Sequence, residues 1–440
     1  RSTTTRSADG AGLRSANGAG LRSANGAGLR SADGDHGTCH SAAAGTPARA
    51  RRRYHEVDLL RFVAAAAVVG FHYMFRASVE HPAFAHTGFS DPGGVFRYGY
   101  LGVDLFFVIS GFVILNSAWN KAPSAFVASR IGRLYPAFWV ACTLTALVMA
   151  FDPSDRFHVT GGQWLVNLTM TPQLFDVPQV DGVYWTLLVE LKFYLLVLVL
   201  CRLGLTLNRV LCFALGWLTI SIWDALVPLP DLLDELLVPE WSGYFVAGIL
   251  FALVAREGWR RRYVVVLLAT YAWALGVAVD FAGRQTERYG ASVSPYVVVG
   301  VVSAIFGIFA LIASHRLQWR WTARVAVIGG LTYPLYLLHE NVGFVLFGLG
   351  RGLASRWVVL AGVLAIVVAL AWALHVTVEQ RFAAPLAGWL RRRWAAYGAV
   401  SSRLGATDVV LDDRHSLADA VSRHWSAPGT APSSSFGRIL

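Results

Sequence analysis

The sequence predicts an all-α membrane protein, a polytopic bundle of about ten transmembrane helices. Of its 440 residues, 55% are hydrophobic and only 15% are charged, and the mean hydropathy is +0.49. This composition excludes an ordinary soluble domain, in which about a quarter of the residues are charged. The 16 Trp and 15 Tyr are typical of residues that anchor helices at the membrane–water interface. The net charge is +11, and the basic residues cluster in the loops between apolar spans. We therefore expect a lipid bilayer, and no nucleic acid, as the partner.

Three regions differ in composition. Residues 1–53 contain an octad repeat, RSADGAGL followed twice by RSANGAGL, whose small polar residues cannot bury a core. We therefore predict a disordered low-complexity tract without a role in chemistry. Residues 54–390 carry the apolar spans and form the predicted transmembrane domain. Residues 391–440 are polar and Ser-rich, which predicts a flexible cytoplasmic tail.

Apolar runs of membrane-spanning length recur through the transmembrane domain. The predicted spans are 57–76, 98–118, 135–151, 183–201, 208–227, 241–255, 263–281, 296–314, 325–348 and 356–376. The loops between them alternate between many and few Arg and Lys residues. By the positive-inside rule, the basic set is cytoplasmic, which places both termini inside and the protein in the inner (cytoplasmic) membrane.

The first span, EVDLLRFVAAAAVVGFHYMF, holds two ionisable residues at opposite depths. Arg61 and His72 are separated by ten residues, which is roughly 16 Å along a helix. Ionisable groups inside a membrane usually mark a pathway or a site. His72 could accept a proton near neutral pH, although a histidine that only supports helix packing fits equally well.

The fourth span, VYWTLLVELKFY, places Glu190 at a depth similar to that of His72. We predict that the carboxylate orients the imidazole. Glu190 could instead contact an acceptor hydroxyl, or form a structural ion pair. Lys192 is not its natural partner, because residues two apart point to different sides of a helix.

Further polar residues lie at or near span ends. RIGRLYP puts Arg130 and Arg133 on one helix face, where they could grip phosphates or simply anchor the span. Asp104 needs a partner and is predicted to shape the site rather than react, and the nearby Gly102 and Gly111 permit close helix approach. The remaining candidates are His339 with Glu340, which could line a cavity, and Glu379, which could clamp arginines. The four cysteines show no metal spacing, so we expect no metal site.

Six segments occur together in a family-like order: DLLRFVAAAAVVGFH, GVDLFFVISGFVI, RIGRLYP, YWTLLVELKFY, LTYPLYLLH and VEQRFAAP. In this order the chain resembles the acyltransferase 3 family of membrane O-acyltransferases, which act on carbohydrates. The resemblance implies transfer of an acyl group, usually acetyl, from acyl-CoA to a hydroxyl of a surface or exported carbohydrate or glycolipid. Departures at Thr186, Leu188, Lys192 and Thr332, and the distance from Glu379 to Pro385, bear on acceptor specificity more than on the reaction.

The resemblance also assigns roles to residues. It implies that His72 is catalytic and that Glu190 is essential. It implies that Arg61, Arg130 and Arg133 bind the CoA phosphates. Trp185, Tyr333, Asp104 and His339 are expected to contact substrate or shape the site.

A mechanism follows as a hypothesis. Arginines at the cytoplasmic mouth would hold acyl-CoA (acetyl-CoA by default), and its pantetheine arm, roughly 15–20 Å long, would span the gap between Arg61 and His72. His72 would deprotonate the acceptor hydroxyl or take the acyl group itself. The alternative is a proton-coupled transporter or polysaccharide-translocation protein that uses the same residues as a proton relay. Transporters often show inverted repeats and broken spans, and this sequence shows neither.

Overall fold

The computed structural model describes residues 54–80, 94–119, 121–152, 157–317 and 322–412, without the side chains of 78, 80, 322–328 and 398–412. The chain divides into two units, Arg1–Arg52 and Arg53–Leu440, and only the second contains described residues. The predicted disordered tract, 1–53, lies outside the described residues. So does the end of the predicted tail, 413–440.

The described residues form helices joined by short turns, with no strand among them. In chain order the elements are α1 (His55–Phe71), η1 (His72–Arg76), α2 (Ala77–Glu80), η3 (Phe96–Tyr98), α4 (Leu101–Ala118), α5 (Pro123–Ala150), α6 (Gly161–Asn167), η4 (Pro172–Phe175), η5 (Gly182–Tyr184), α7 (Trp185–Leu203), α8 (Leu207–Asp224), α9 (Asp231–Leu237), α10 (Pro239–Glu257), α11 (Arg261–Tyr289), α12 (Pro295–Ala313), α13 (Thr322–Leu338), α14 (Glu340–Leu349), α15 (Arg356–Leu374), η6 (His375–Glu379) and α16 (Gln380–Asp412).

The predicted fold class is confirmed: within the described part of the chain, 8 helices are long and apolar enough to cross a membrane. The chain is therefore an integral membrane protein. Each predicted span coincides with a helix or, for 325–348, with the pair α13 and α14. The third predicted span, 135–151, is the end of a longer helix, α5, so that RIGRLYP lies inside the helix rather than before it.

Helix α10 lies at the centre of the bundle and packs closely on α4. Of its most apolar stretch, 83% is buried. The contact depends on small residues, because a Cβ at Gly111 would lie 2.2 Å from the Phe245 carbonyl oxygen, and one at Gly248 would lie 2.2 Å from that of Val108. Gly102 similarly allows α4 to approach α1 at the Ala64 carbonyl. The close approach predicted at Gly102 and Gly111 is confirmed.

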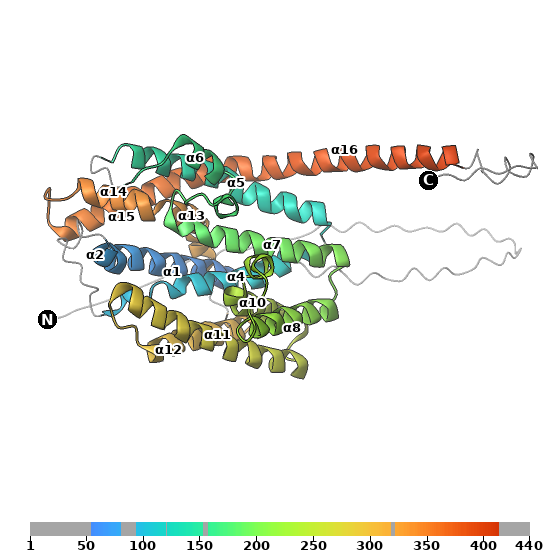
Figure 1. Ribbon diagram of the computed structural model, residues 1–440, viewed down its shortest axis with the longest axis horizontal. Helices are drawn as coiled ribbons and strands as arrows, with labels where there is room; N and C mark the ends of the chain where they lie inside the picture. The colour runs from blue at the N-terminus through green and yellow to red at the C-terminus, as the bar shows by residue number, and fades with distance from the viewer. Residues whose placement is uncertain (1–53, 81–93, 120, 153–156, 318–321, 413–440) are drawn as a thin grey trace, which may run out of the picture. The chain divides into compact units, whose positions relative to one another are not determined.

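Helix α4 lies between α1 and α7. It packs against α1, α7 and α10, and these helices run side by side (Figure 1). Helix α1 also packs against α13. Residues on α1 and α7 at equal depth can therefore be separated by α4.

Two π-helical turns interrupt the long helices. The turn η1 continues α1 from His72 to Arg76, and η6 joins α15 to α16 from His375 to Glu379. A π-turn rotates the following side chains relative to a regular helix and often marks a functional site. Both turns contribute residues to the cavities described below, two from η1 and one from η6.

Helix α16 continues to Asp412, beyond position 391, at which the tail was predicted to begin (Figure 1).

Candidate active site

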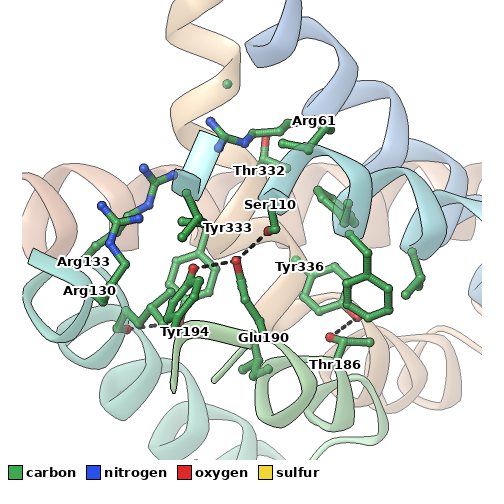
Figure 2. A pocket seen from close by; sticks show the side chains of 18 of the residues that line it. Arg61, Ser110, Arg130, Arg133, Thr186, Glu190, Tyr194, Thr332, Tyr333 and Tyr336 are labelled. Carbon is green, nitrogen blue, oxygen red and sulfur yellow. Dashed lines mark hydrogen bonds between the residues drawn. The ribbon is translucent and has the colours of Figure 1, made fainter. Parts of the chain in front are cut away.

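One cavity of about 100 Å³ is lined by three arginines (Figure 2). Arg61 comes from α1, whereas Arg130 and Arg133 come from one face of α5. The polar residues that also line this arginine cavity are Ser110, Thr186, Glu190, Tyr194, Thr332, Tyr333, Tyr336 and Glu379. Two carboxylates therefore face three guanidinium groups, so the cavity has an excess of positive charge.

The arginine side chains are positioned by neighbouring aromatic and acidic groups. The Arg130 guanidinium lies 5.9 Å from the ring centroids of Phe126 and Tyr194. Arg61 pairs with Asp58, one turn earlier, at 3.3 Å. In Figure 2, Arg130 and Arg133 point to the same side of the cavity, an arrangement that suits a multiply charged anion.

Glu190 lies in the arginine cavity. Its Oε1 accepts hydrogen bonds from Ser110 Oγ at 2.7 Å and from the Tyr194 hydroxyl at 2.5 Å (Figure 2). The prediction that Glu190 orients His72 is therefore wrong. Depth along a span does not fix the direction in which a side chain points, and α4 lies between α1 and α7.

A second, larger cavity of about 710 Å³ contains His72. It lies at the far end of α1 from Arg61. The polar and aromatic residues that line this histidine cavity include Arg76, Tyr100, Trp185, Glu240, Trp241, Arg284, Gln285, Arg288, Tyr289, Tyr336 and Glu340. The predicted Trp185 lies in the wall of this cavity, where its ring packs at a tilt against Trp241 with centroids 5.1 Å apart.

The two buried histidines form a chain of hydrogen bonds that fixes their protons. His72 Nδ1 lies 2.9 Å from the Val68 carbonyl oxygen and 3.1 Å from His339 Nε2. His339 Nδ1 lies 2.8 Å from the Tyr336 carbonyl oxygen. Because a carbonyl only accepts, each Nδ1 is the protonated nitrogen of a neutral ring. His339 thus supports His72 from behind and leaves His72 Nε2 with its lone pair exposed to the cavity.

The carboxylate that faces His72 is Glu340, the first residue of α14. Its Oε2 lies 3.7 Å from His72 Nε2, its Oε1 pairs with Arg76, and the side chain is 2% exposed. Glu340 was predicted only to line a cavity, and Arg76 was not among the predicted site residues. A signal was available, since Arg76 follows His72 at helical spacing and Glu340 follows the buried His339 within an apolar run.

The arginine and histidine cavities share part of their walls. Val103 and Tyr336 line both of them. The Tyr336 hydroxyl bonds Thr186 Oγ1 at 2.8 Å (Figure 2). The cavities are therefore adjacent, and Tyr336 and Val103 lie between them.

The other predicted residues have structural contacts. Asp104 is 4% exposed and faces the Tyr244 hydroxyl on α10, in agreement with a structural or site-shaping role. The Tyr333 hydroxyl donates to the Leu134 carbonyl at 3.0 Å and lines the arginine cavity. Lys192 was predicted not to pair with Glu190, and it pairs with Glu235. Glu379 lies in the arginine cavity and accepts from His375 Nδ1 at 2.8 Å.

Comparisons with known proteins agree with the resemblance read from the motifs. A family model described as an acyltransferase domain matches residues 54–376. The acyltransferase MdmB of Streptomyces mycarofaciens is 26% identical over 323 residues, 64% of this chain and 80% of that protein. The peptidoglycan O-acetyltransferase OatA of Listeria monocytogenes is 26% identical over 33% of this chain, and the exopolysaccharide production protein ExoZ of Rhizobium meliloti is 31% identical over 23%.

The matched regions of these relatives differ in extent. The match covers 24% of OatA and 34% of ExoZ, and no solved structure matches the chain. The family match, by contrast, runs through nearly all of the predicted transmembrane domain. The chain therefore belongs to the acyltransferase 3 family, and it is an enzyme of the O-acetyltransferase type.

Proposed function

We propose that the protein transfers an acetyl group from cytoplasmic acetyl-CoA to a hydroxyl of a cell-surface or exported carbohydrate. The observation that carries this proposal is the shared wall of the two cavities. The arginine cavity suits the anionic end of an acyl-CoA, and Tyr336 and Val103 separate it from His72. A thioester arm that passes these two residues would bring the acyl carbon to the imidazole.

The donor side depends on the three arginines. Arg61, Arg130 and Arg133 hold the CoA phosphates by charge-assisted and bidentate hydrogen bonds. Glu190 and Glu379 limit the positive charge of the cavity and orient the groups that surround it. Because the basic loops, including the start of α5, face the cytoplasm under the positive-inside rule, the donor enters from that side. Both termini are then cytoplasmic, in the inner membrane.

The chemical step takes place at His72 Nε2. The acceptor hydroxyl loses its proton to Nε2, and its oxygen attacks the thioester carbon. The carbon–sulfur bond breaks, and the proton on Nε2 passes to the departing thiolate. In the alternative route His72 takes the acetyl group itself and then delivers it to the acceptor. The bonding of Nδ1 to Val68 and His339 leaves Nε2 ready for either step.

The acceptor side is the histidine cavity. Its two tryptophans, Trp185 and Trp241, offer apolar faces, and its charged residues offer hydrogen bonds, a combination that fits a sugar ring. The names of OatA and ExoZ refer to peptidoglycan and exopolysaccharide, which supports a carbohydrate acceptor here.

A membrane assay tests the proposal. Membranes that contain the protein are incubated with [14C]acetyl-CoA and a bacterial glycan fraction, beside matched membranes that lack it. We expect label on the glycan and free CoA in equal amounts, only where both protein and glycan are present. Consumption of acetyl-CoA that does not depend on the glycan, or glycan labelling that is equal in both membranes, would overturn the proposal.

A further inference from the structure

We infer that Glu340 binds a second hydroxyl of the acceptor, adjacent to the one that is acetylated, so that the enzyme selects sugars with neighbouring hydroxyl groups. This inference rests on the proposed function, because it takes His72 Nε2 as the point at which the acceptor hydroxyl is deprotonated. It adds a requirement that the proposed function does not contain: the acceptor makes two hydrogen bonds here, one to each of two residues.

The first acceptor atom is His72 Nε2. The protonated Nδ1 is held by the Val68 carbonyl and by His339, so the opposite nitrogen carries a lone pair. His72 is 7% exposed and lines the histidine cavity. A molecule in this cavity must supply a donor if it is to bond Nε2.

The second acceptor atom is Glu340 Oε2. Arg76 bonds the other oxygen, Oε1, and Oε2 is buried without a hydrogen-bond donor among the residues that the structure describes. A buried carboxylate oxygen without a donor is costly, and such groups are normally satisfied by water or by a ligand. Asp181 also faces Glu340. Its two oxygens accept from the backbone amides of Val183 at 3.2 Å and Asn341 at 3.1 Å, while burial and the facing Glu340 raise the pKa of this carboxyl.

The two lone-pair atoms lie 3.7 Å apart at the cavity wall. Neither can donate to the other while His72 is neutral, so a guest must provide one proton to each. A water molecule has two protons and meets this need. A single alcohol has only one, and would leave either the base or the carboxylate without a donor when it displaces the water. Two hydroxyls on adjacent ring carbons supply both protons from one rigid molecule.

The Glu340 carboxylate is held in place by its neighbours on two sides. A Cβ added at Gly182 would lie 2.6 Å from Glu340 Oε1, so the glycine leaves room for the side chain. Arg76, on the π-turn that also presents His72, fixes it from the other side. The turn η1 therefore carries His72 and, through Arg76, also positions Glu340, so that the distance between these two side chains is fixed.

The first arm of the test is the position of the product. The glycan labelled by the wild-type protein is mapped by NMR, and methyl pyranosides are compared with their monodeoxy analogues as acceptors. We expect the acetyl group on a carbon whose neighbour bears a free hydroxyl. We also expect kcat/KM to fall about tenfold to a hundredfold when that neighbour is deoxy, as for a lost hydrogen bond to a charged group. Acetylation at carbons without such a neighbour would overturn the inference while leaving acetyl transfer intact.

The second arm compares variants. In Glu340→Gln and Glu340→Ala, the preference for the intact sugar over its deoxy analogue should shrink to about threefold or less. Glu257→Gln, which removes a carboxylate paired with Arg262 outside both cavities, should keep the wild-type preference. A purely structural role of Glu340, or a proton shared between Asp181 and Glu340, would lower the rates for both sugars equally and leave the preference unchanged. That result would also refute the inference. If wild-type membranes label no glycan, the proposed function fails, and the inference falls with it.

Discussion

The arginine cavity and the histidine cavity differ in how their residues are brought together. In the arginine cavity, Arg130 and Arg133 lie one turn apart on α5, and such neighbours can be read from spacing. In the histidine cavity, His72 meets His339 and Glu340, which lie more than two hundred residues further along the chain. Both cavities have charged and aromatic residues in their walls, but the second is larger and is lined by His72, Trp185 and Trp241. The difference suggests that one cavity binds the donor and the other binds the acceptor and performs the chemistry.

The largest expected effect comes from the histidine cavity. His72→Ala should reduce the rate of acetyl transfer about 10²–10⁴-fold, because it removes the general base. The KM for acetyl-CoA should change little, since the arginines remain in place. Initial rates with labelled acetyl-CoA in membranes with matched protein amounts measure both quantities.

His315→Ala is the matched control for this variant. His315 also contacts a helix backbone, the Ala255 carbonyl at 3.2 Å, but it does not line either cavity. It should retain nearly the full rate. Normal transfer by His72→Ala would remove His72 from the mechanism and with it the proposed division of labour between the cavities.

The same contrast shows what the sequence could predict. Hydropathy and loop charge place the helices, because the bilayer allows few alternatives to an apolar helix. Spacing along one helix predicts that Arg130 and Arg133 share a face, and it predicts the axial distance between Arg61 and His72. The partner of His72 could not be found in this way. Glu190 and Glu340 are both acidic residues near membrane-depth histidines, and only the packing of α1 between α4 and α13 decides which one faces His72.

Substitutions in the arginine cavity should have a smaller effect, and they should change the KM for acetyl-CoA rather than the maximal rate. Arg130→Ala and Arg133→Ala should each raise the KM for acetyl-CoA about tenfold to a hundredfold, the loss of one charge-assisted contact. The rate at saturating acetyl-CoA should stay within a few-fold of wild type. Arg130→Lys keeps the charge but loses bidentate geometry, so it should lie between. Steady-state kinetics over a range of acetyl-CoA concentrations measure these values.

Arg262→Ala is the control for charge alone. Arg262 lies in the first turn of α11, pairs with Glu257 and Asn208, and lies outside both cavities. Its removal lowers the net charge by the same amount, and the KM for acetyl-CoA should not change. An equal rise in KM for Arg262→Ala would mean that general surface charge, rather than a defined phosphate site, attracts the donor.

The smallest effect is expected at Lys192, the charged residue of α7 that is closest in sequence to Glu190. Lys192 points away from the arginine cavity and pairs with Glu235 on α9, whose side chain is 51% exposed. The Lys192 side chain is only 11% exposed, but solvent reaches its partner carboxylate and screens the pair, so the pair contributes about 1 kcal/mol or less to stability. Lys192→Met should therefore leave the KM and the maximal rate within about twofold of wild type and lower the free energy of unfolding by no more than about 1 kcal/mol. Glu235→Gln should likewise leave the KM and the maximal rate within about twofold of wild type, because it breaks the same pair from the other side. A large rise in the KM for acetyl-CoA in Lys192→Met, without one in Glu235→Gln, would instead place Lys192 among the donor-binding residues and extend the arginine cavity along α7.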